Sequence, residues 1–144
     1  MRYPEPLILP MREDLTRHGV QETRSPEEVD AALRPENGTV LVVVNSVCGC
    51  AAGKARPGVV MSLQGGPRPD KVVTVFAGAD LEAVEHVRNL LADYPPSSPS
   101  VALFKEGKPV YMLHRRDIES STAGEIAATL SAAYAHYCAQ PQSA

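Results

Sequence analysis

Residues 39–45, Thr-Val-Leu-Val-Val-Val-Asn, constrain the fold more than any other stretch, because they form a continuous, largely β-branched run of strand length. A strand that is apolar on both faces must be covered on both sides, as a central strand between layers of helices is. A second buried strand is predicted over residues 71–77, Lys-Val-Val-Thr-Val-Phe-Ala. Two such strands joined by a crossover helix pair in parallel with a right-handed connection.

Two helices are predicted before the first strand. Residues 1–9 are interpreted as an extended arm, and Met11 starts a short helix that ends at Gly19. The next helix buries Val29 and Leu33, which lie four residues apart. Its start carries a capping residue, a proline suited to the first helical position and the acidic residue of a capping box: Ser25, Pro26 and Glu28.

Three more helices and a hairpin follow. A helix that begins at Cys50 is disturbed at Pro57, whose ring removes a backbone hydrogen bond. Asp80 caps the next helix, whose predicted buried face comprises Leu81, Val84, Val87, Leu90 and Leu91. Residues 101–113 form a hairpin, and Pro109 places its second strand near an edge. The last helix begins at a capping box of Thr122 and Glu125 and buries Ile126, Leu130, Ala133, Tyr134 and Tyr137.

These elements predict an α/β fold with a central mixed β-sheet, helices on both faces and an N-terminal extension. We expect one domain over residues 1–144, with an N-terminal arm and short helix over 1–24 and the core over 25–138. A chain of this length buries a core without help from a metal or a disulfide. The cysteines are therefore not needed to hold the fold together.

Charge and segment composition narrow the class of protein. The net charge is -3, with 14 Lys and Arg scattered among 17 Asp and Glu, which argues against a nucleic-acid partner. The N-terminus has no secretory apolar region, and no stretch is long enough to span a membrane. We therefore expect a cytoplasmic protein, and in that compartment three cysteines favour reactive or metal-binding roles over a disulfide framework.

The sequence Cys48-Gly49-Cys50 follows the first buried strand directly. A cysteine at the first turn of a helix lies where free N–H groups and the helix dipole stabilise a thiolate. Gly49 keeps the approach open, and Lys54 and Arg56 add positive charge on the following turns, where solvated surface charge is their default role. A disulfide between these two cysteines would close a small, strained ring that is easily reduced. The pair thus suits a thiol-exchange centre.

Other interpretations of the cysteines remain open. Either could be a small buried hydrophobic residue, and Cys138 fits a packing role at the end of the last helix. A metal site would need two further ligands, and none of the candidates is paired at a ligand-like spacing: Cys138, His18, His86, His114 and His136. We therefore expect no metal. Upstream of the hairpin, Ser98-Pro99 is a candidate cis peptide bond, because this proline leads from a loop into a buried strand.

The order of these motifs, with a strand, a cysteine motif at a kinked helix, a later Ser-Pro and the VALFKEGKPV hairpin, resembles the thioredoxin fold. That resemblance implies that Pro99 is the cis-proline facing the active cysteine and that the backbone of Ser98 pairs with substrate. More narrowly, VVVNSVCGCAAGKARP, DKVVTVFAGAD, YPPSSPSVALFKEGKPV and MREDLTRHGV resemble the bacilliredoxin family over nearly the whole chain.

The bacilliredoxin resemblance implies an enzyme that removes the small thiol bacillithiol from mixed disulfides on cytoplasmic proteins. Cys48 would accept bacillithiol, which acts as a co-substrate without any tightly bound cofactor, and Cys50, free bacillithiol or a reductase would discharge it. Bacillithiol is anionic, so candidate contacts are Lys54, Arg56, Arg115 and Arg116. The alternatives are a general disulfide reductase or isomerase, or a metal-binding or redox-sensing module. The apolar arm could also dock on a second subunit, which leaves a homodimer open.

Overall fold

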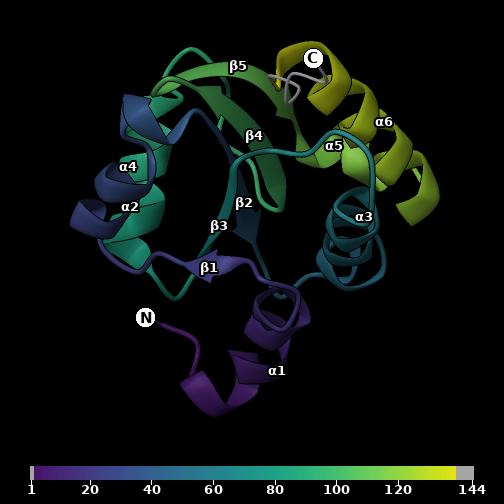
Figure 1. Ribbon diagram of the computed structural model, residues 1–144. Helices are drawn as coiled ribbons and strands as arrows, with labels where there is room; N and C mark the ends of the chain where they lie inside the picture. The colour runs from purple at the N-terminus through teal and green to yellow at the C-terminus, as the bar shows by residue number, and fades with distance from the viewer. Residues whose placement is uncertain (1, 139–144) are drawn as a thin grey trace.

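The computed structural model describes residues 2–138, so the predicted domain limits at residues 1 and 144 lie outside the described range. A five-stranded sheet with the order β1-β3-β2-β4-β5 forms its centre (Figure 1). Its strands are β1 (Gln21–Glu22), β2 (Thr39–Asn45), β3 (Lys71–Phe76), β4 (Ser100–Lys105) and β5 (Lys108–Leu113). β1, β3 and β2 are parallel, whereas β4 and β5 are antiparallel to their neighbours. The predicted mixed sheet is confirmed, with β5 at an edge.

Helices cover both faces of this sheet, as predicted. In Figure 1, α2 (Pro26–Ala32) and α4 (Leu81–Leu90) lie on one side, and α3 (Arg56–Ser62), α5 (Arg115–Glu119) and α6 (Ala123–Tyr137) lie on the other. A short 3-10 turn, η1 (Pro35–Asn37), connects α2 to β2. No helix within residues 2–138 is long and apolar enough to cross a membrane.

Strand β2 joins the two hydrophobic cores. All seven of its residues are buried. Leu41 and Val43 belong to the core beneath α3 and α6, whereas Val40, Val42 and Val44 belong to the core beneath α2 and α4. Because successive side chains of a strand point to opposite faces, a central strand needs an apolar residue at every position.

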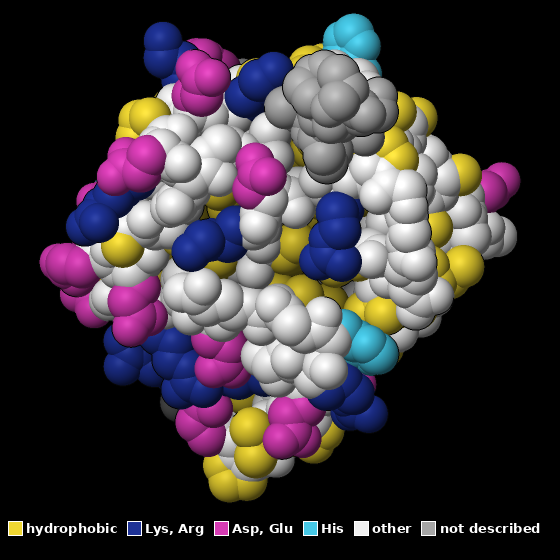
Figure 2. All heavy atoms as spheres, in the orientation of Figure 1, with side chains coloured by type: hydrophobic (Ala, Val, Ile, Leu, Met, Phe, Trp, Pro, Cys, Tyr) yellow, Lys and Arg dark blue, Asp and Glu magenta, His cyan; other side chains and the backbone are white. Residues whose placement is uncertain are grey.

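The N-terminal arm differs from expectation. Helix α1 (Glu5–Thr16) already begins at Glu5 and contains Pro10, where an extended arm was predicted. Tertiary contacts outweigh the cost of the proline: Ile8 is fully buried against Phe76 and Ala79. Exposed hydrophobic side chains gather over α1 at the lower tip of Figure 2, and the exposed hydrophobic residues of this helix are Leu7 and Leu9.

A buried arginine fastens α1 to the sheet. The Arg12 guanidinium donates to both carboxylate oxygens of Asp80, at 2.8 and 2.9 Å, and to Glu5 at 2.9 Å. Asp80 precedes α4 but makes no capping bond, which corrects the predicted cap. Its carboxylate instead accepts hydrogen bonds from Arg12 and from the Phe76 N–H. The partner of Asp80 is 68 residues away in the chain, which local pattern does not reveal.

Two further local predictions need correction. Ser25 caps α2 by accepting from the Glu28 N–H, but the Glu28 carboxylate reaches back to the N–H of Arg24, so the capping box is displaced by one residue. In α4, Leu81 and Leu90 are exposed, and Ala83 takes a place in the buried face beside Val84, Val87 and Leu91. The capping box of α6, formed by Thr122 and Glu125, is confirmed.

The predicted disturbance near Pro57 takes the form of a wide helical turn. Residues Ala51–Ala55 form a π-helical turn, η2, in which the Arg56 N–H donates to the Ala51 carbonyl five residues earlier. This turn runs directly into α3. Widened turns of this kind are frequent at functional sites, and η2 lies immediately after the two cysteines.

Candidate active site

Cys48 lies between the carboxyl end of β2 and the start of the helical segment at Gly49. Its carbonyl accepts hydrogen bonds from the N–H groups of Ala51, at 3.0 Å, and Ala52, at 3.2 Å. Cys48 and Cys50 both carry free, partly exposed thiols, and Gly49 between them is exposed, with no atom within 4 Å of where a Cβ would lie. The motif therefore presents two accessible thiols at a helix start, as predicted.

The thiol of Cys48 is stabilised as a thiolate. The Ser46 hydroxyl lies 3.3 Å from Cys48 Sγ and donates to it. Burial alone would raise the pKa of the Cys48 thiol. The hydrogen bond from Ser46 and those from two backbone N–H groups, with a smaller contribution from the charge of Arg115, outweigh that effect and lower the pKa below its ordinary value. Cys48 is thus the nucleophilic thiol of the pair.

Cys50 has the opposite environment. Its Sγ lies 3.6 Å from the carboxylate of Glu119, which accepts the S–H hydrogen bond. Burial, the nearby negative charge and hydrogen bonding of Cys48, and the carboxylate of Glu119 all raise the pKa of the Cys50 thiol. Cys50 is therefore harder to ionise than Cys48, which separates an attacking thiol from a reserve thiol.

Arg115 connects both cysteines to the loop before β4. Its guanidinium donates to the Glu119 carboxylate at 3.1 Å and to the Ser98 carbonyl at 3.2 Å. The Ser98-Pro99 peptide bond is cis, and Pro99 is buried at the start of β4. Cys48, Ser98 and Arg115 line one cleft of about 350 Å³. Three of the residues singled out from the sequence are therefore brought together at one opening.

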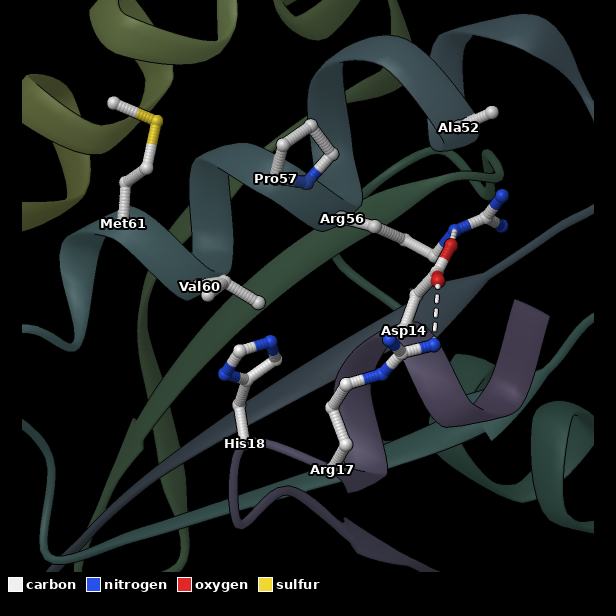
Figure 3. Close-up of a pocket in the computed structure, with 8 residues that line it drawn as sticks. All are labelled: Asp14, Arg17, His18, Ala52, Arg56, Pro57, Val60 and Met61. Carbon is white, nitrogen blue, oxygen red and sulfur yellow. Dashed lines mark hydrogen bonds and ion pairs between the residues drawn. The ribbon is translucent and has the colours of Figure 1, made fainter. Parts of the chain in front are cut away.

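Arg56 is placed differently from Arg115. Its side chain is 4% exposed, and its guanidinium donates to Asn45 Oδ1 and to the Ser46 carbonyl, each at 2.9 Å. It also pairs with Asp14 of α1 at 3.0 Å, in the hollow between α1 and α3 that Figure 3 shows. Through these hydrogen bonds Arg56 stabilises the segment that leads to Cys48. Its expected contact with substrate stays a prediction.

The two other basic candidates also lie outside the Cys48 cleft. Lys54 donates to the backbone carbonyl of Glu119 and so ties η2 to the end of α5. Arg116 is exposed and lines a neighbouring hollow beside Pro95 and Pro96. Their predicted contacts with an anionic ligand stay predictions.

Sequence reasoning missed four residues around the cysteines. Ser46 and Glu119 contact the two thiols, and Arg88 and Tyr3 line the Cys48 cleft. Ser46 lies two residues before Cys48, so its hydroxyl could have been considered from the sequence. Glu119 is 69 residues from Cys50, and helix α5, which carries it, was not predicted. Only the fold brings that carboxylate to the thiol.

The remaining cysteine and the histidines form no visible ligand set. Cys138 is 5% exposed and packs in the core beneath α6, where burial raises the pKa of its thiol. Within residues 2–138, no group of three or more His, Cys, Asp and Glu side chains is arranged to hold a metal ion.

Solved structures place this fold among the thioredoxins. An oxidised thioredoxin from Arabidopsis thaliana superposes with a TM-score of 0.56 at 16% identity, covering 82% of this chain and 96% of that one. An oxidised thioredoxin from Plasmodium falciparum gives 0.54 at 20% identity, covering 84% of this chain and all of the other. At such identities the likeness concerns the fold. The activated Cys48 at the start of a helix adds the chemistry, and together they define a thiol-disulfide oxidoreductase.

Sequence comparisons then identify the family. A family model described as "Disulphide isomerase" matches residues 3–138. A bacilliredoxin from Koribacter versatilis is 51% identical over 94% of each chain, and one from Shouchella clausii is 46% identical over 94% of each. A bacilliredoxin from Salinibacter ruber is 50% identical over 96% of this chain and 81% of its own. The chain belongs to the bacilliredoxin family.

Proposed function

We propose that this oxidoreductase removes bacillithiol from mixed disulfides on cytoplasmic proteins. The observation that carries the proposal is the contrast between the two thiols: Cys48 has a lowered pKa and opens onto a cleft, while Cys50, directly after Gly49, has a raised pKa. An exchange enzyme needs one thiolate at rest, because two adjacent thiolates would repel each other.

The exchange proceeds through a mixed disulfide on Cys48. Its thiolate attacks the bacillithiol sulfur, a new S–S bond forms, and the client cysteine leaves as a thiolate that takes up a proton from solvent. The Ser98 carbonyl already accepts from Arg115, so the Ser98 N–H is the group we expect to pair with the bound client. Bacillithiol is a co-substrate in this reaction.

The adduct on Cys48 must then be discharged. We propose Cys50 as the nearest candidate, acting after its proton passes to the carboxylate of Glu119 at 3.6 Å. Attack of that thiolate on Cys48 releases bacillithiol and leaves a Cys48–Cys50 disulfide, which an external thiol reduces. Free bacillithiol or a separate reductase attacking the adduct directly are the competing routes.

The test uses Cys50→Ala, which keeps the acceptor but removes the adjacent thiol. The variant is mixed with a bacillithiolated protein, and intact masses are recorded under non-reducing conditions. We expect Cys50→Ala to gain the mass of one bacillithiol and the Cys48→Ala/Cys50→Ala double variant to gain none. No transfer to Cys50→Ala, while Cys48 still reacts with a small alkylating agent, would overturn the proposal.

A general disulfide reductase or isomerase is the second candidate, because the matching family model is described as a disulphide isomerase. The two functions differ in substrate. An isomerase restores activity to a protein with scrambled disulfides, whereas the proposed enzyme acts on small-thiol adducts and leaves scrambled disulfides unchanged. Measuring both activities and the reduction potential of the cysteine pair on one preparation separates them.

A further inference from the structure

The cleft beside Cys48 is bounded by residues from several separate parts of the chain. Arg88 projects from α4, Arg115 from α5, and Ser98 from the loop before β4. Tyr3 forms another wall: its N–H donates to the Gly78 carbonyl at 3.0 Å, and its ring lies over Gly78, where a Cβ would come within 2.5 Å of the ring. The volume of about 350 Å³ suits a small molecule.

Arg88 is exceptional among the arginines described above. Its Nε atom is buried and has no hydrogen-bond partner within the described part of the chain. None of the ion pairs among residues 2–138 includes it, whereas Arg12 and Arg56 are paired with carboxylates. Arg88 is partly exposed and lines the cleft, so an anion bound there meets a guanidinium that no carboxylate within residues 2–138 already neutralises.

The charge of the cleft favours an anion. Of the described residues that line it, Arg88 and Arg115 are the charged ones, and none is acidic. The charge of Arg115 is partly offset by Glu119, which lies outside the cleft lining. Among residues 2–138, no carboxylate pairs with Arg88 in this way. A guanidinium binds a carboxylate through two parallel hydrogen bonds, which gives both affinity and orientation.

We infer that Arg88 binds a carboxylate of the small thiol that is transferred to Cys48, with Tyr3 as a partly apolar wall of the same cleft. This inference rests on the proposed function and specifies how that thiol is recognised. It assigns selection of an acidic small thiol to α4, a helix that carries none of the cysteines. Arg115 would support the same carboxylate from the Ser98 side of the cleft.

The experiment compares two mixed disulfides on the same test protein, one with bacillithiol and one with cysteamine, which has no carboxylate. For Arg88→Met we expect kcat/KM with the bacillithiol substrate to fall roughly ten- to a hundredfold, as loss of a charge-assisted pair predicts. The cysteamine substrate and the alkylation rate of Cys48 should not change. Arg34→Met, at an exposed arginine distant from the site, is the matched control and should leave both substrates unaffected.

The outcomes separate the inference from the proposed function. Equal activity of Arg88→Met and wild type on bacillithiol would overturn the inference and leave the function standing. An equal loss on both substrates would show a structural role and would also overturn it. Wild type that fails to remove bacillithiol would overturn both. Arg88→Lys keeps the charge but not the fork geometry, and it should retain more activity than Arg88→Met. It serves as the second variant if Arg88→Met folds poorly.

Discussion

The groups around Cys48 and those around Cys50 differ in burial. On the Cys48 side, Ser46 is 7% exposed, and its carbonyl accepts a hydrogen bond from Arg56, which is 4% exposed. On the Cys50 side, the contact is Glu119, whose side chain is 47% exposed on the short helix α5. A buried framework thus fixes the nucleophile, whereas surface groups control its neighbour. We expect changes on the first side to cost more than changes on the second.

The largest effect should come from removing the nucleophile itself. Cys48→Ala should abolish transfer of bacillithiol and eliminate the fast phase of alkylation at neutral pH, because burial and Glu119 still raise the pKa of the remaining accessible thiol. Stopped-flow alkylation with mass detection gives both results. If Cys48→Ala kept the wild-type fast phase, the assignment of the two thiols would have to be reversed.

Arg56→Met should cause the next largest effect, on stability. It leaves the Ser46 carbonyl without the guanidinium that donates to it, and it leaves Asn45 Oδ1 with only the Ser46 N–H as donor. The free energy of unfolding should fall by about 2 to 4 kcal/mol. Urea denaturation measures this change, with Arg116→Met, at an exposed arginine, as the control. A loss no larger than that of the control would show that the buried framework is not needed on the Cys48 side.

Ser46→Ala should act on reactivity more than on stability. The Ser46 hydroxyl stabilises the thiolate and so lowers the pKa of Cys48, and its loss raises that pKa. The thiolate fraction at neutral pH then falls, alkylation slows several-fold, and the midpoint of its pH profile moves to higher pH. Ser120→Ala, at an exposed serine directly after α5, is the control. A midpoint that stays in place would assign the lowered pKa to the backbone N–H groups and Arg115.

The smallest effect is expected on the exposed side. In a Cys48→Ala background, Glu119→Gln removes a negative charge beside Cys50, so the pKa of Cys50 falls and its thiolate fraction rises. We expect alkylation of Cys50 at neutral pH to increase about twofold, since solvent screens exposed charges. Glu36→Gln, at an exposed glutamate on η1, supplies the reference rate. An unchanged rate for Glu119→Gln would show that the Glu119 carboxylate does not raise the pKa of Cys50.

Local sequence signals account for most of the sheet and for the position of the thiols. The apolar runs of β2 and β3 predict buried parallel strands, and Thr122 and Glu125 predict the start of α6. The prediction failed where one residue has competing partners. Asp80 looks like a helix cap, but a buried arginine 68 residues away binds its carboxylate more strongly than the local N–H groups do.

Sequence by itself determined the two buried parallel strands, the hairpin, the position of Cys48 at the end of β2 and the family resemblance, because hydrophobic periodicity, turn residues and the cysteine motif are local features. Tertiary structure alone decided which charges face the thiols. Glu119 reaches Cys50 across 69 residues, Arg56 is turned into the interior, and Arg88 is left without a partner in the Cys48 cleft. Coulombic and hydrogen-bond energies depend on distance in space, and that distance exists only once the chain has folded.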